Sequence, residues 1–300
     1  MAPEFEPVRV PDPSLRAVQE LCDVAAPYDH GHTGLFLEAM NESNRWHARR
    51  SEFFRRLWYG KPVGDITEQP FVHAHFFKMH EVLSVPRNEI VVHATSSGTT
   101  GQKSQMFWDA WTVRANQRMV ARICAHHGLI DAEHARHLVD FGGIRALQRF
   151  THNGPPVRIS GFPAFLSFTV DRVRAKVTGP SGSADVRIRG SYGSVEHSVP
   201  YVGCAHHNLH VPTWSRALVR DVRTLEPLPY GKSGYLQLMS PHITSAPAQS
   251  VLMDDLAVLH APEECGCGTA TPWFEVLGRA GVFRNRSCAI SAAELLKGRA

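Results

Sequence analysis

The chain lacks the segments that mark secreted or membrane-spanning proteins. Its first residues, Met-Ala-Pro-Glu-Phe-Glu-Pro, contain no apolar core of a signal peptide, and no apolar run approaches the roughly 20 residues that span a bilayer. Six cysteines among 300 residues are too few for a disulfide scaffold. We therefore expect a reduced, cytoplasmic protein that has no membrane partner.

The chain also lacks a large excess of charge of one sign. The 32 Lys and Arg residues nearly balance the 28 Asp and Glu residues, for a net charge of +4, and no basic block of the kind that follows a nucleic-acid backbone is present. We therefore expect no nucleic-acid partner. A hydrophobic fraction of 43% and a charged fraction of 20% are typical of a globular protein and exclude a disordered chain, a collagen and a coiled coil.

Hydrophobic periodicity predicts an α/β fold with a β-rich C-terminal portion. We divide the chain into an irregular leader over residues 1–40, an α/β portion over residues 41–200 and a β-rich portion over residues 201–300. The predicted helices are Leu15–Val24, Asn41–Trp58, Glu68–Leu83, a helix capped by Asp109 that ends near Gly128, Pro163–Val177 and Ser291–Lys297. The predicted strands are Glu89–Thr95 (buried), Leu138–Phe141, Val186–Arg189, Ala217–Val222, Tyr235–Met239, Val251–Met253, Ala257–His260 and Trp273–Leu277.

A hydroxyl-rich loop follows the first predicted strand and precedes the helix capped by Asp109. Its sequence is Thr95-Ser-Ser-Gly-Thr-Thr-Gly-Gln-Lys-Ser104. Glycines let a backbone approach phosphate groups closely, serine and threonine supply donors, and Lys103 adds a positive charge. The Walker A spacing is absent. The loop therefore predicts either a phosphate site of another class or a polar connection between a strand and a helix.

Three further motifs follow this loop. The four are Ser-Ser-Gly-Thr-Thr-Gly (96–101), Tyr-Gly-Ser-Val-Glu (192–196), Met-Asp-Asp-Leu (253–256) and Leu-Gly-Arg (277–279). In this order they resemble the adenylate-forming superfamily. Shorter matches, among them Phe77-Lys78, His210–Trp214 and Cys265–Gly268, are similar to its acyl-protein synthetase branch, the bacterial-luminescence type of fatty-acid activating enzyme, with phenylacetate-CoA ligases as the next relatives. The resemblance spans roughly residues 45–298.

The resemblance implies an enzyme that joins a carboxylic acid to ATP as an acyl-adenylate and releases pyrophosphate. Residues 41–200 would then bind the nucleotide, and residues 201–300 would complete the ATP site. Lys103 and the loop residues Ser96, Ser97, Gly98, Thr99, Thr100 and Gly101 would hold the β- and γ-phosphates. Tyr192, flanked by Ser191 and Gly193, would line the adenine, and Glu196 would hold Mg²⁺. Asp255, chosen over Asp254 because Leu256 follows it, would accept from the ribose hydroxyls, and Arg279 would reach the ribose or a phosphate.

Four soft ligands suggest a second site. Cys204, His210, Cys265 and Cys267 form a Cys₃His set of the kind that holds a structural Zn²⁺. The Cys-x-Cys pair is tighter than the usual knuckle, His206 and His207 are competing ligands, and four unligated side chains are the alternative.

Cys288 is a candidate acyl acceptor. Arg284 and Arg286 nearby would favour its thiolate, and the related synthetases carry an acyl-accepting cysteine near the chain end. The alternative is a small apolar residue beside the last helix.

Two departures from the family open a second hypothesis about function. The chain ends just after the Arg279 motif, without the lid domain and catalytic lysine of coenzyme-A ligases, and the interval from Gly101 to Tyr192 is short. Acyl transfer to an enzyme cysteine or to a partner protein then fits better than transfer to free coenzyme A. We therefore expect a partner protein that either donates the acyl group to this chain or accepts it from this chain. The alternative is a non-catalytic nucleotide- or metal-binding partner protein. A serine hydrolase is disfavoured because no G-x-S-x-G motif occurs.

Overall fold

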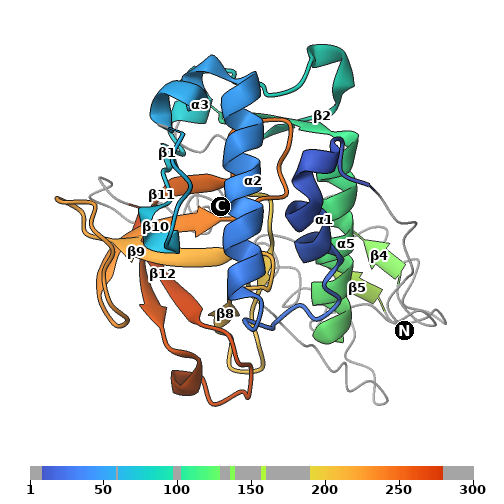
Figure 1. Ribbon diagram of the computed structural model, residues 1–300. Coiled ribbons are helices and arrows are strands. Elements are labelled where there is room, and N and C mark those ends of the chain that lie inside the picture. The colour runs from blue at the N-terminus through green and yellow to red at the C-terminus, as the bar shows by residue number, and fades with distance from the viewer. Residues whose placement is uncertain are drawn as a thin grey trace, which may run out of the picture.

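The computed structural model describes residues 9–58, 60–96, 103–128, 136–138, 157–159 and 190–279. Its helices are α1 (Arg16–Asp23), α2 (Thr33–Arg50), α3 (Glu52–Leu57), α4 (Phe76–Met79) and α5 (Ala110–His126), with short 3₁₀ turns at Pro13–Leu15, Ile66–Glu68, Arg87–Glu89 and Pro262–Glu264. Figure 1 shows α1, α2 and α5 together beside the sheet strands. Apolar side chains of these three helices share one core with Trp214 and Met239.

The main sheet has six strands and carries most of the C-terminal part of the described chain. Its order is β8 (Leu209–His210), β12 (Trp273–Arg279), β11 (Ser250–His260), β10 (Ser233–Met239) and β9 (Arg216–Arg220). These strands run antiparallel to their neighbours, and β1 (Val72–His73) adds a parallel pairing to the first part of β11. The predicted strands Val251–Met253 and Ala257–His260 are one long strand, because the β-bulge between Leu256 and Ala257 interrupts the alternation without ending the pairing.

Three small two-stranded sheets lie outside the main one. They pair β2 (Ile90–Thr95) with β3 (Gln105–Asp109), β4 (Arg136–Leu138) with β5 (Val157–Ile159), and β6 (Ser191–Tyr192) with β7 (Tyr201–Val202). The strand predicted over Glu89–Thr95 is in the right place but is not buried: among the described strands β2 pairs only with β3, and its residues alternate between half-buried and exposed. The predicted strand–loop–helix unit is therefore a β-hairpin followed by α5, with Asp109 capping that helix and Gly128 ending it at φ 62° as expected.

Two helix predictions were wrong. The helix expected from Asn41 to Trp58 begins earlier, at Thr33, and breaks at Ser51, whose extended backbone and side chain cap α3. The apolar pattern did not reveal where α2 begins, because the buried face of α2 carries polar side chains. Asn41 exchanges hydrogen bonds with the backbone of Val63, and Asn44 pairs with Gln69.

The helix expected over Glu68–Leu83 is replaced by a 3₁₀ turn, β1 and the single turn α4. Pairing of Val72 with Val251, together with the bond from the Ala74 amide to the Leu252 carbonyl, holds this segment extended against β11.

The short helix near Leu15–Val24 is confirmed as α1. Predicted elements at 163–177, 186–189 and 291–297 lie outside the described residues.

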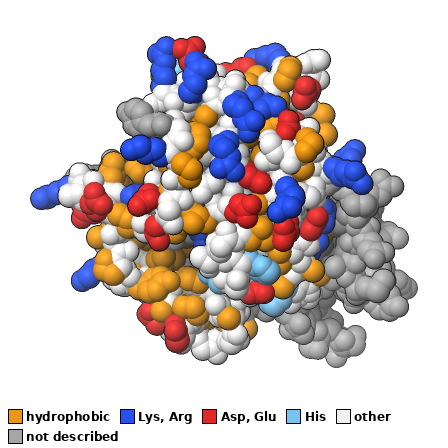
Figure 2. Space-filling model, in the orientation of Figure 1, with side chains coloured by type: hydrophobic (Ala, Val, Ile, Leu, Met, Phe, Trp, Pro, Cys, Tyr) orange, Lys and Arg blue, Asp and Glu red, His pale blue; other side chains and the backbone are white. Residues whose placement is uncertain are grey.

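Surface character agrees with the small net charge. Figure 2 shows acidic and basic side chains interspersed over the described part of this face. Within the described residues, the structure contains no helix that combines the length and apolar character required of a membrane span.

Two fully buried histidines make the stability of the fold depend on pH. The Nε2–H of His47 donates to the Ile243 carbonyl and Nδ1 contacts the Ser84 hydroxyl, which fixes a neutral ring, and His242 lies between two serine hydroxyls. Burial lowers the pKa of His47 and of His242 from 6.5 to about 3.

We therefore predict that the free energy of unfolding falls as the pH drops below 6.5. In that range the two histidines are protonated in the unfolded chain but stay neutral in the folded one. The free energy of unfolding therefore falls by up to about 1.4 kcal/mol per pH unit for each histidine. Above pH 6.5 the two rings are neutral in both states and contribute no pH dependence. Chemical denaturation between pH 7.5 and pH 5 measures the slope. A His47→Gln variant should flatten it, whereas a variant of the exposed His93 should not; equal slopes for both variants would contradict the assignment.

Candidate functional site

Three side chains predicted to bind one nucleotide meet at the middle of β11. The Tyr192 hydroxyl donates to Oδ2 of Asp255 at 2.8 Å, and Nε of Arg279 lies 3.6 Å from Oδ1 of the same carboxylate. The sheet brings the last two together because Asp255 and Arg279 are register partners on β11 and β12. Tyr192 reaches them from β6, about 60 residues earlier in the chain.

Burial and neighbouring charges shift the pKa values of both Asp255 and Tyr192. Loss of solvent raises the pKa of Asp255, and the Asp254 charge adds to this, while the Tyr192 hydrogen bond and the Arg279 charge oppose it. Burial and the Asp255 carboxylate hold the pKa of Tyr192 well above 10. Tyr192 therefore remains a donor at neutral pH, and Asp255 is largely enclosed, with 13% of its side chain exposed.

The neighbouring Asp254 faces a different set of residues. Its carboxylate oxygens lie 3.6 Å from Nδ1 of His73 and 3.6 Å from Nζ of Lys78. Successive side chains of a strand point to opposite faces, so only one of the two aspartates can join Tyr192 and Arg279. Asp255, the residue chosen from the sequence, is the one that lies beside Tyr192 and Arg279, whereas Lys78, named in the sequence only as part of a local match, lies beside Asp254.

Glu196 lies in a turn directly after β6. Its side chain is 5% exposed, and its charge is close enough to Tyr192 to act on that phenol. Ser191 and Gly193 flank Tyr192, and β6 is held by pairing of Tyr192 with Tyr201 of β7. The structure thus places Glu196 close enough to Tyr192 for its charge to act there.

The predicted phosphate loop is anchored at its base. The Ser96 amide donates to the Ser104 carbonyl at 3.1 Å, and the Ser104 amide donates to the Ser96 hydroxyl at 2.9 Å, which closes the β2–β3 hairpin. Met106 of β3 shares a core cluster with Tyr201 and Met253, so the hairpin packs on the sheet that carries Asp255. Lys103 is exposed. The other loop residues, Ser97, Gly98, Thr99, Thr100 and Gly101, and the candidate acceptor Cys288 lie outside the described residues.

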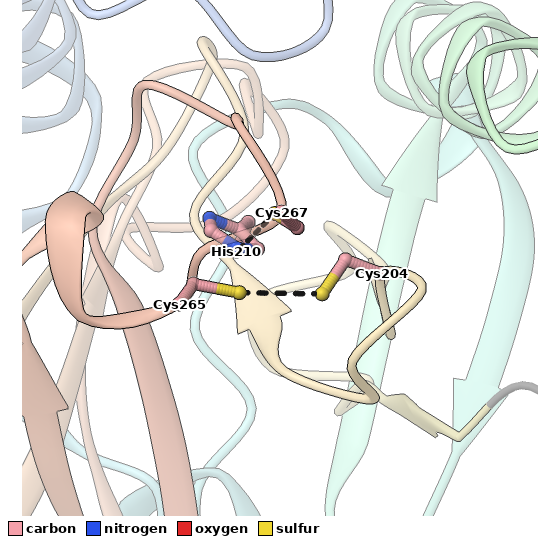
Figure 3. A group of neighbouring side chains, drawn as sticks. All are labelled: Cys204, His210, Cys265 and Cys267. Atoms are coloured by element: carbon pink, nitrogen blue, oxygen red, sulfur yellow. Dashed lines mark hydrogen bonds between the residues drawn. The ribbon is translucent and has the colours of Figure 1, made fainter.

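The four candidate metal ligands converge (Figure 3). Their ligand atoms all lie within 4.8 Å of one another, with Cys204 Sγ 3.5 Å from Cys265 Sγ and Cys267 Sγ 3.2 Å from His210 Nε2. Two thiolates on one tetrahedral zinc would be about 3.8 Å apart, given a Zn–S distance of about 2.3 Å. The separations therefore fit a single small ion.

Polar groups around the four ligands suit a metal centre. The Nδ1–H of His210 donates to the Thr271 carbonyl at 2.8 Å, which directs its Nε2 lone pair toward the sulfurs. Backbone or amide N–H groups of His206, Asn208 and Thr269 donate to the three sulfurs. The exposed His206 uses Nδ1 to donate to the Cys265 carbonyl, so His210 is the better placed imidazole.

Sequence reasoning missed the buried layer beneath Tyr192. Tyr201 packs against the Tyr192 ring, and its hydroxyl contacts His197 Nε2 at 2.8 Å and Ser215 Oγ at 2.6 Å. His197 directly follows Glu196, the last residue of the motif, and that adjacency was the one available signal. The pairing with Ser215 depends on tertiary folding and leaves no spacing pattern.

The chain is similar to a known protein family over part of its length and to a ligase over most of it. Residues 169–297 match the family profile described as acyl-protein synthetase, LuxE. A long-chain-fatty-acid–luciferin-component ligase of Vibrio harveyi is 20% identical over an alignment of 317 positions that covers 81% of this chain and 82% of the relative.

Solved structures agree in fold. An open conformation of 2-hydroxyisobutyryl-CoA ligase, in complex with 2-HIB-AMP and CoA, superposes with a TM-score of 0.70 at 16% identity, covering 94% of this chain and 83% of that one. The postadenylation state of the same ligase gives a TM-score of 0.66 at 15% identity, with 92% and 73% coverage. The predicted resemblance is therefore confirmed: the chain has the fold of an adenylate-forming ligase, and its residues 169–297 match the acyl-protein synthetase family.

Proposed function

We propose that this chain converts a carboxylic acid and ATP into an acyl-adenylate and pyrophosphate. The observation that carries the proposal is the meeting of Tyr192, Asp255 and Arg279 beside the Glu196 turn, because these residues come from three separate motifs and share one place in the fold. The matched relatives support the same chemistry: the Vibrio harveyi protein is named as a fatty-acid ligase, and the ligase structures hold an acyl-AMP.

Each side chain has a part in this reaction. A carboxylate oxygen of the acid attacks the α-phosphorus of ATP, and the bond to the β-phosphate oxygen breaks as pyrophosphate leaves. Asp255 accepts hydrogen bonds from the ribose hydroxyls, Tyr192 lines the adenine side, and Arg279 contributes positive charge beside the ribose or a phosphate. Lys103 and the loop from Ser96 to Gly101 hold the β- and γ-phosphates. Mg²⁺, held by Glu196, would neutralise charge on the phosphate oxygens.

The test is pyrophosphate exchange with a panel of carboxylic acids. We expect radiolabelled pyrophosphate to enter ATP only when ATP, Mg²⁺ and a suitable acid are all present, and Glu196→Gln to reduce that exchange. ATP binding without exchange for any acid would instead support a non-catalytic nucleotide-binding protein. The absence of both binding and exchange would overturn the proposal.

The acyl group is then passed to a cysteine of the enzyme or to a partner protein, with Cys288 as the candidate cysteine. Its thiolate would attack the acyl carbonyl and release AMP, which leaves a thioester. We predict that radiolabelled acid and ATP label the chain, that hydroxylamine discharges the label, and that Cys288→Ala prevents the labelling. A hydroxylamine-sensitive label of equal yield in Cys288→Ala would remove this residue from the mechanism.

The Cys204–His210–Cys265–Cys267 set is proposed to hold a structural Zn²⁺. Four protein ligands fill a tetrahedral site and leave no position for substrate, which is the arrangement of structural rather than catalytic zinc. Cys204 precedes β8 and His210 ends it, whereas Cys265 and Cys267 follow β11, so the ion would hold together two segments about 60 residues apart.

A further inference from the structure

The turn that carries Glu196 has an unusual backbone. The Ser198 amide donates to the Ser194 carbonyl at 2.8 Å, and the Val199 amide donates to the His197 carbonyl at 2.9 Å. The second bond closes a three-residue γ-turn whose central residue, Ser198, has φ 58°. Such a turn is rare and strained for a residue with a Cβ atom, and strain of this kind persists only where the surroundings enforce it.

A buried histidine enforces it. Oγ of Ser198 lies 2.9 Å from Nε2 of His242, and Nδ1 of that ring lies 2.7 Å from the Ser240 hydroxyl. The ring is fully buried, and the His242 carbonyl accepts from the Trp111 indole of α5 at 3.0 Å. His242 is thus a fixed point in the core to which the strained residue is tied.

The turn is also held on its other side. His197, the residue between Glu196 and Ser198, is 1% exposed, and its ring stacks on Tyr201 with an interplanar angle of 16°. Its Nε2 contacts the Tyr201 hydroxyl, and Tyr201 is the strand partner of Tyr192. Glu196 therefore follows Tyr192 by four residues in a segment whose beginning and end are both anchored in the core.

We propose that Ser198 and His242 are positioning residues that fix the Glu196 carboxylate for Mg²⁺ through the strained turn. This inference rests on the proposed function, because the adenylation reaction gives Glu196 its metal. Neither residue needs to touch the nucleotide. Their effect is to keep the turn in a conformation that it would otherwise leave.

Three serine variants separate positioning from stability. Ser198→Ala removes the hydroxyl and keeps the backbone strain, whereas Ser198→Gly removes the hydroxyl and the strain together. Ser84→Ala is the matched control, because Ser84 also bonds a buried histidine, at 2.7 Å to His47, but lies outside the turn. The readouts are thermal unfolding and the Mg²⁺ concentration that gives half-maximal pyrophosphate exchange.

We expect Ser198→Ala to raise that Mg²⁺ concentration by about tenfold or more, the scale seen when groups that orient a metal ligand are removed. Ser198→Gly should stay closer to the wild type, and Ser84→Ala should leave the Mg²⁺ dependence unchanged while it destabilises the fold to a similar degree. An unchanged Mg²⁺ dependence in Ser198→Ala would overturn the inference. Equal loss in the alanine and glycine variants would do so as well, because it would show that the loss does not come from relaxation of the strained turn.

A crystal structure of Ser198→Ala keeps the inference separate from the proposed function. If the wild-type chain shows no exchange with any acid, the adenylation proposal fails, but the structure of the variant still reports on the turn. Departure of residue 198 from positive φ, together with displacement of Glu196, would support the positioning role. An unchanged turn would overturn it.

Discussion

Replacing Asp255 with alanine is expected to lower kcat/KM for ATP in adenylate formation by about 100-fold or more. The carboxylate is nearly enclosed, and both of its oxygens face groups that define the proposed nucleotide site. Two hydrogen bonds from ribose hydroxyls to a charged group are each worth about 1.5–3 kcal/mol, and both are lost together. Pyrophosphate exchange at several ATP concentrations measures the change, and circular dichroism checks that the variant is folded.

Asp254→Asn is the matched control for that loss. Asp254 is the adjacent residue, but its carboxylate faces His73 and Lys78 and is partly exposed, and such ion pairs contribute little. We expect its kcat/KM to stay within about threefold of the wild type. A loss in Asp254→Asn equal to that in Asp255→Ala would show that the assignment to Asp255 is wrong.

Disruption of the Cys₃His set should produce the largest loss of stability. We expect the purified chain to carry about one zinc, and Cys265→Ser to lose that zinc and to lower the free energy of unfolding by about 3 kcal/mol or more. The loss should be smaller than the roughly 10–16 kcal/mol that zinc supplies to zinc-finger peptides, because the main sheet retains its own core. Elemental analysis and chemical denaturation provide the two readouts.

Cys124→Ser controls for the loss of a thiol as such. Cys124 lies on α5, is half buried and belongs to no part of the ligand set. It should retain zinc and most of the stability. Wild-type protein without zinc, or equal zinc loss from both variants, would contradict the structural metal site.

The nucleotide site could be predicted better than the elements around it, because the resemblance to the adenylate-forming superfamily named its residues motif by motif. Asp255 and Arg279 were named from separate motifs, and antiparallel pairing of β11 with β12 places them opposite each other. The metal set was also named from the sequence, because its residues are soft ligands that occur as two close pairs, Cys204 with His210 and Cys265 with Cys267. Neither prediction required knowledge of the helix boundaries.

Helix boundaries failed where tertiary contacts overrode the local pattern. Asn41 and Asn44 are polar and add nothing to an apolar pattern, yet both are buried on α2 and are satisfied by Val63 and Gln69, which lie more than 20 residues away. Likewise, Val72 is extended because β11 pairs with it. The His197–Tyr201–Ser215 contacts could not be anticipated, because each depends on where the chain returns after a turn.

A crystal structure with a non-hydrolysable acyl-adenylate analogue and Mg²⁺ would test the central claim most directly. Our account predicts both ribose hydroxyls within hydrogen-bond distance of Asp255, the adenine beside Tyr192, and the metal on Glu196. An analogue bound elsewhere, with the Tyr192–Asp255 hydrogen bond and the Glu196 side chain remote from it, would contradict the account.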